Sequence, residues 1–72
     1  MIDSGFHDVL GQVKRLLADS PFDEVRRIEV KAHGECISLQ GRVHSFYLKQ
    51  VAQETVRSAT RGIELVNQVR VD

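Results

Sequence analysis

The chain has 72 residues, of which 42% are hydrophobic and 28% charged, so it suits one small globular domain and is too apolar for a disordered protein. Ten basic residues balance ten acidic ones, and a net charge of zero excludes the global positive field that draws proteins to nucleic acid. A single cysteine excludes an internal disulfide framework, and no apolar run approaches the ~20 residues of a membrane span.

The N-terminal segment, residues 1–5, has no basic region followed by an apolar core. We therefore expect no signal peptide, a disordered start and the cytoplasm as the default compartment. An amphipathic helix should follow, because apolar residues recur with the helical period and Asp3 or Ser4 is placed to cap it. The apolar stripe that should face the core comprises Phe6, Val9, Leu10, Val13, Leu16 and Leu17.

A proline ends this helix at Ser20-Pro21, because the residue before a proline disfavours the helical conformation. After a loop that contains Asp23 and Glu24, alternating residues predict a first strand over 27–32. Its inward residues are Ile28, Val30 and Ala32, and its outward residues are Arg27, Glu29 and Lys31. A tight turn is predicted at His33-Gly34, since Gly34 can adopt a positive φ, and it returns the chain as a hairpin.

A second strand follows the turn and carries a glycine on the apolar side of its alternation. We expect Gly41 to lie inward, where a side chain would collide with a helix. The inward residues of this strand are Ile37, Leu39, Gly41 and Val43, and the outward residues are Ser38, Gln40 and Arg42.

Ser45 is placed to cap a second helix. Its core-facing stripe comprises Leu48, Val51, Ala52, Thr55, Val56 and Ala59. The helix should stop at Arg61-Gly62, with Ile63 folding back as in a Schellman cap. The last strand contains Leu65, Val66, Val69 and Val71, with Gln68 and Arg70 facing away. Its alternation is blurred at Val66-Asn67, which is consistent with a bulge.

The predicted order is therefore α-β-β-α-β, an α+β domain. Short connections should make the strand–helix–strand unit a right-handed crossover, which places the last strand parallel to the second. Because each strand has one apolar face, we expect two helices on one face of a three-stranded mixed sheet with the second strand central. An alternative order places the first strand in the middle and makes the sheet fully antiparallel.

From Leu10 to Val71 the chain resembles the BON domain, a small bacterial module with the same order of helices and strands. The resemblance rests on hydrophobic spacing and on the glycines predicted to be structural, Gly34, Gly41 and Gly62. The matching motifs are Ile28-x-Val30, Gly34-x-x-Ile37-x-Leu39-x-Gly41-x-Val43, Ser45 with Lys49 and Ala52, and Gly62-Ile63-x-x-Val66-x-x-Val69-x-Val71. The resemblance implies a non-enzymatic binding module of cell-envelope proteins that attaches to phospholipid membranes or binds other ligands. The chain departs from the family pattern in carrying one copy of the domain and no export signal.

No catalytic or cofactor-binding motif occurs, so we expect neither an enzyme nor a cofactor. His33-x-x-Cys36 offers two metal ligands, but His44 lies roughly 26 Å along the strand from Cys36 at ~3.3 Å per residue. With no further residues to close a site of four ligands, no metal centre is predicted. Cys36 lacks an oriented base, and Asp23-Glu24 lack the burial that raises a carboxylate pKa.

The strand alternation gathers basic side chains on the open face of the sheet, where Glu29 and Asp72 are the acidic residues that oppose them. The predicted anion-binding patch comprises Arg27, Lys31, Arg42 and Arg70. Its partner would be an anionic phospholipid. The competing interpretation is a solvated face whose long cations discourage edge-to-edge pairing.

An interaction with an unidentified protein, or weak self-association of a marginal core, is the alternative function, so the chain is a monomer or a weak homo-oligomer. We expect no nucleic-acid partner, because the outward strand positions lack the aromatic residues on which RNA bases stack.

Overall fold

The computed structural model describes residues 4–72. Its elements are α1 (Ser4–Ala18), α2 (Asp23–Arg26), β1 (Glu29–His33), β2 (Cys36–Val43), α3 (Phe46–Arg57), the 3-10 helix η1 (Ser58–Thr60) and β3 (Glu64–Val71). The segment expected to be disordered, residues 1–5, overlaps α1 at Ser4 and Gly5. Residues 1–3, which include the predicted cap Asp3, lie outside the described part of the chain.

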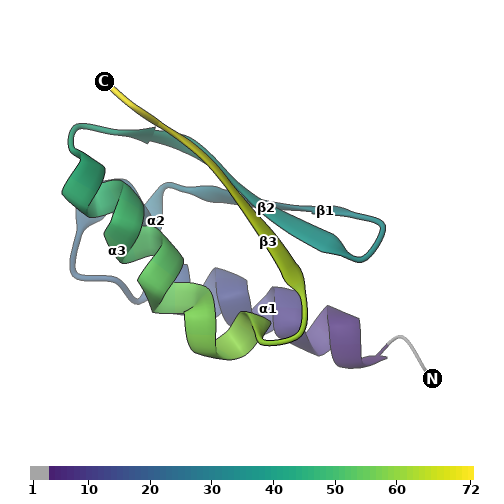
Figure 1. Ribbon diagram of the computed structural model, residues 1–72. Helices are drawn as coiled ribbons and strands as arrows, with labels where there is room; N and C mark the ends of the chain where they lie inside the picture. Colours follow the sequence, from purple (N-terminus) through teal and green to yellow (C-terminus); the bar gives the residue numbers. More distant parts are fainter. Residues whose placement is uncertain (1–3) are drawn as a thin grey trace.

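The sheet has three strands in the order β1-β2-β3. β2 pairs antiparallel with β1, from Glu29↔Gln40 to His33↔Cys36, and parallel with β3, from Cys36↔Glu64 to Val43↔Val71. The predicted α+β fold with a mixed sheet and a central second strand is confirmed, and the fully antiparallel order is wrong. In Figure 1 the helices lie along one face of the sheet, and the other face is uncovered.

The core lies between the helices and the helix-facing side of the sheet. α1 contacts β1, α3 contacts β2 and β3, and the two helices contact each other, so together they cover that side. The apolar stripes of the helices and the alternating apolar residues of the strands converge there. The buried cluster comprises Val13, Leu17, Val25, Ile28, Leu39, Val43, Ala52, Val56 and Val69.

A third, short helix was not predicted. Part of the segment expected to be a loop forms α2, in which Val25 is fully buried, and β1 begins at Glu29, two residues later than predicted. The Phe22 carbonyl accepts the N–H groups of Val25 and Arg26, both at 3.1 Å. Four residues are too few to display a helical period, so the pattern of the sequence does not reveal this element.

The β1–β2 hairpin turns one position later than predicted. Because His33 pairs with Cys36, the two turn residues are Gly34 and Glu35. Gly34 has a φ of 59°, and Glu35 does not have a positive φ, which is the pattern of a type II′ turn.

The predicted Schellman cap after the second long helix is also wrong. α3 ends at Arg57 and η1 continues to Thr60. Arg61 then has a ψ of 132° and Gly62 a φ of 78°, and the Ile63 N–H donates to the Thr60 carbonyl at 3.0 Å. These features define a type II turn, in which the third residue is usually glycine.

β3 contains no bulge, because its pairing with β2 is continuous. The alternation is blurred because Asn67 occupies a helix-facing position between apolar residues. Its Nδ2 donates to the Lys49 carbonyl and to Gln53 Oε1, both at 3.2 Å, while its Oδ1 accepts the Val69 N–H at 3.2 Å. The inward polar side chain is therefore satisfied by α3 and by its own strand.

Gly41 lies on β2 with its missing side chain directed toward Ile28. A Cβ at this position would lie 3.5 Å from the Ile28 Cα and 3.6 Å from its Cγ1, which is ordinary van der Waals contact, and no helix atom lies within 4 Å. The predicted collision with a helix is therefore wrong. The φ of Gly41 is +149°, a conformation that side-chain-bearing residues rarely adopt, so the backbone itself requires glycine.

We predict that Gly41→Ala lowers the free energy of unfolding by about 1–3 kcal/mol, because alanine is strained at this φ. Gly11→Ala is the matched control, since a Cβ at Gly11 meets nothing within 4 Å and the residue is helical. That variant should gain roughly 0.5–1 kcal/mol. Urea unfolding followed by circular dichroism measures both, and an unchanged midpoint for Gly41→Ala would contradict the strain at this residue.

Candidate anion-binding site

Two residues of the predicted patch, Arg42 and Arg70, lie side by side on the open face. They are partners in the β2–β3 register, and both are exposed. Within residues 4–72 neither forms an ion pair. Adjacent strands lie about 4.8 Å apart, so the two positive charges repel each other. A bound anion would relieve this repulsion. We call Arg42 and Arg70 the arginine pair.

A shallow hollow on the open face surrounds the arginine pair and is also lined by Gln40, Gly41 and Gln68. Gln40 and Gln68 are register partners, and Gln40 Nε2 donates to Gln68 Oε1 at 3.2 Å. This hydrogen bond uses the Gln68 oxygen and leaves its NH₂ group available as a donor. The hollow therefore presents guanidinium and amide donors, a combination that suits phosphate or carboxylate oxygens.

The other two residues of the predicted patch contact acidic side chains. The Lys31 Nζ lies 3.9 Å from the Glu29 carboxylate on the same strand. Arg27 precedes β1, and its guanidinium lies 2.6 Å from the Asp23 carboxylate of α2. The predicted patch of four cations therefore divides into the arginine pair and two cations that are each compensated by a neighbour.

The two metal-ligand candidates in the hairpin, His33 and Cys36, face each other across β1 and β2, with Glu64 opposite Cys36 on β3. Burial raises the pKa of the Cys36 thiol, and the Glu64 carboxylate raises it further. A raised pKa keeps the thiol protonated and weakly nucleophilic at neutral pH. Among the residues that the structure describes, no three His, Cys, Asp or Glu side chains are grouped to hold a metal ion.

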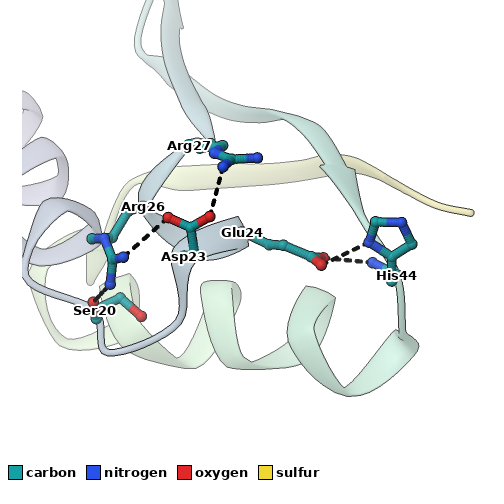
Figure 2. A network of polar contacts seen from close by, with 6 residues as sticks. All are labelled: Ser20, Asp23, Glu24, Arg26, Arg27 and His44. Carbon is teal, nitrogen blue, oxygen red and sulfur yellow. Dashed lines mark hydrogen bonds and ion pairs between the residues drawn. The ribbon is translucent and has the colours of Figure 1, made fainter.

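A second polar cluster surrounds α2 (Figure 2). Arg26 donates to Asp23 at 3.0 Å and to the Ser20 carbonyl at 2.8 Å. Asp23 also forms the ion pair with Arg27, so one carboxylate serves two guanidinium groups. These two arginines are therefore used within the domain, unlike the arginine pair.

Glu24 extends from α2 toward the end of β2, where it meets His44 (Figure 2). One carboxylate oxygen accepts the His44 backbone N–H at 2.7 Å, and the other lies 2.7 Å from His44 Nδ1. These two contacts, of which the side-chain contact has the larger effect, hold the pKa of the Glu24 carboxyl below its usual value of 4.5. The contact joins α2 to the connection between β2 and α3, two residues after Arg42.

A family model described as BON domain matches residues 8–72, nearly the whole chain. The chain belongs to the BON domain family. The resemblance inferred from the sequence motifs is thereby confirmed, and membership indicates a non-catalytic binding module. Comparisons with curated proteins and with solved structures gave no match. Within residues 4–72 of this BON domain, no helix has the length and apolar character needed to cross a membrane.

Two features of this BON domain do not follow from its sequence. The alternation predicts that Gln40 and Gln68 face outward, but their hydrogen bond depends on the register of two strands 28 residues apart. The contact of Glu24 with His44 joins residues 20 apart, one of them in the helix that the sequence does not reveal. Both contacts depend on how distant parts of the chain pack together, which local sequence patterns do not specify.

We predict that Glu24→Gln destabilises the domain in a pH-dependent way. A carboxyl whose folded-state pKa is lowered stabilises the fold above its unfolded pKa, and this contribution disappears as the pH falls through the folded-state value. Wild type should therefore exceed Glu24→Gln in melting temperature at about pH 7 and lose this advantage as the pH falls below 4.5 and through the lowered folded-state pKa. Thermal melts of both proteins across this range measure the difference.

Glu54→Gln is the matched control, because Glu54 forms an exposed pair with Arg57 at 3.4 Å. Exposed pairs of this kind contribute little, so the control should melt with wild type at every pH. A difference between wild type and Glu24→Gln that stays constant with pH would contradict the role assigned to the Glu24 carboxylate.

Proposed function

We propose that this BON domain docks on anionic phospholipid surfaces and that the arginine pair binds the lipid headgroups. The proposal is carried by one observation: Arg42 and Arg70 are exposed, adjacent and, within residues 4–72, without an ion-pair partner. Family membership supports a binding module. Phospholipid is the partner that the resemblance to the family implies.

The chemistry of the hollow suits a phosphodiester. A guanidinium group presents its N–H donors in a planar fork that matches two oxygens of one phosphate. Two such forks lie on neighbouring strands, and the Gln68 NH₂ group in the next row adds a neutral donor. A headgroup phosphate bound here would meet donors from β2 and β3 together.

The net charge of zero does not oppose this function. The domain measures 39 × 20 × 16 Å, whereas charges in physiological salt are screened beyond about 8 Å. The charges close to the membrane therefore dominate, and each cation there contributes about 1 kcal/mol. Two cations give a weak and salt-sensitive attachment, which is the binding behaviour we expect.

Protein binding or self-association remains the competing function, and β3, the longer of the two edge strands, offers the longer template for it. β3 spans Glu64–Val71 and, within the described residues, pairs on one side only. Its use as a template for another strand is opposed by Asn67, whose Oδ1 already accepts the Val69 N–H. This contact opposes strand addition at β3.

We predict that reversing both charges, with Arg42→Glu and Arg70→Glu together, weakens binding to anionic vesicles by at least about 30-fold. This estimate follows from the loss of about 1 kcal/mol for each cation. Co-sedimentation with vesicles of equal parts phosphatidylglycerol and phosphatidylcholine measures the effect. Binding of the wild type should also weaken as salt is raised, since exposed charges are then screened.

Lys14→Glu together with Arg15→Glu is the matched control, because it changes the net charge equally at exposed positions of α1. This variant should bind nearly as wild type does. Equal losses in the two double variants would contradict a specific role for the arginine pair. A lack of co-sedimentation of the wild type with these vesicles at low salt would contradict the proposed function itself. A molecular mass that rises with protein concentration in the absence of lipid would favour self-association.

A further inference from the structure

Two aromatic side chains at the start of α3 are left in solvent. Phe46 is 73% exposed and Tyr47 is 65% exposed, whereas the next most exposed large apolar side chain of the described residues, Val71, reaches 36%. Neither ring belongs to the buried core cluster. Rings this exposed add little to the packing of the core, and an adjacent pair of them offers a surface that suits an apolar partner. We call Phe46 and Tyr47 the aromatic pair.

The two rings are supported differently. Tyr47 makes an edge-to-face contact with Phe22, with ring centroids 6.1 Å apart and an interplanar angle of 84°. One side of the Tyr47 ring thus rests on the domain. Phe46 has the Lys49 ammonium 6.0 Å from its ring centroid, so a cation accompanies the more exposed ring.

The first turn of α3 is held in place from two sides. Ser45 caps the helix, and its Oγ accepts the Leu48 N–H at 3.2 Å. The preceding residue, His44, is held by the Glu24 carboxylate at 2.7 Å. The position of the aromatic pair is therefore fixed before any partner is bound, which lowers the entropic cost of docking.

The aromatic pair and the arginine pair lie at the same end of the molecule. β2 ends at Val43, and only His44 and Ser45 separate it from α3. β3 ends beside β2, since Val71 is the partner of Val43 and the Asp72 N–H donates to the Val43 carbonyl at 2.9 Å. Figure 1 shows the end of β2, the start of α3 and the C-terminus together, opposite the β1–β2 hairpin.

We infer that the aromatic pair inserts into the interfacial layer of an anionic phospholipid bilayer, so that the domain docks with this end rather than with its open face laid flat. The inference rests on the proposed function. Aromatic residues concentrate at the membrane–water interface, where an apolar ring and a polar group such as the Tyr47 hydroxyl are both accommodated. Phe46 would enter more deeply, because no aromatic neighbour holds it.

The charges at this end complement an anionic surface. Lys49 lies beside Phe46, and the long side chains of Arg42 and Arg70 can reach the headgroup level while the rings lie deeper. Three of the acidic groups near this end contact basic partners or His44: Asp23 pairs with Arg26 and Arg27, Glu24 contacts His44, and Glu54, which lines a hollow with Tyr47, pairs with Arg57. Asp72 is a further acidic group there. The same end therefore combines apolar rings with cations, as interfacial anchors do.

The chain has no tryptophan, so Phe46→Trp places a single fluorescent reporter at the site while keeping an aromatic anchor. Gln12→Trp, at an exposed position of α1, is the matched control. With vesicles of equal parts phosphatidylglycerol and phosphatidylcholine at low salt, Phe46→Trp emission should shift to shorter wavelength and become quenched by brominated lipid. The control should bind equally and keep the emission of a solvated indole. Phe46→Ser should weaken vesicle binding roughly tenfold, since it removes a ring that would be buried in the bilayer on docking.

The outcomes separate this inference from the proposed function. If Phe46→Trp co-sediments with the vesicles but its emission does not shift, lipid docking stands and the insertion of the aromatic pair into the bilayer is contradicted. If neither tryptophan variant nor wild type co-sediments with them, the proposed function fails and the inference fails with it. An emission shift without vesicles that grows with protein concentration would overturn the inference in favour of a second copy of this chain as the partner.

Discussion

The pairing of β2 with a strand on each side is the constraint on which the structure depends. Because β2 is antiparallel to β1 and parallel to β3, the chain must return over the sheet between β2 and β3, and α3 makes that crossover. The strands have one apolar face, so α1 and α3 share it and the opposite face is left to polar residues. The same register sets the candidate site, since it places Arg42 opposite Arg70 and Gln40 opposite Gln68. The parallel run of β2 and β3 also brings both strand ends to the start of α3, where the exposed aromatic residues lie.

Local arrangement, rather than total charge, decides what this surface can bind. Ten basic and ten acidic residues cancel over the chain. Several of them cancel within short distances: Asp23 compensates Arg26 and Arg27, and Glu29 lies near Lys31. These contacts are exposed and contribute little to stability, but they leave fewer uncompensated cations that a ligand can contact. What is left on the open face is a compact feature, the arginine pair, at the end of the sheet that also carries Phe46 and Tyr47.

Much of the fold follows from the sequence because its signals are periodic. The apolar stripe of α1, the alternation of β2 and the Ser45 cap of α3 each specify their element locally, and the crossover rule then places β3 next to β2. The failures have physical causes. α2 is too short to show a period, Asn67 is satisfied by an α3 that lies far from it in sequence, and Gly41 is required by its backbone angle rather than by a neighbouring helix. At the site, alternation assigns Arg42 and Arg70 to the open face, but it cannot show that Asp23 engages Arg27. The exposure of Phe46 could have been predicted from the sequence, because this residue falls outside the apolar stripe of its helix.

Backbone amide signals of isotope-labelled protein, followed during a titration with bicelles that contain anionic phospholipid, test the central claim most directly. We predict that the largest changes occur at Arg42, Phe46, Tyr47 and Arg70, while the amides of α1 and of the hairpin turn at Gly34 stay nearly unchanged. Changes concentrated on α1 or on the hairpin, or none at low salt, would contradict docking through the end of the sheet at which β2, β3 and α3 meet.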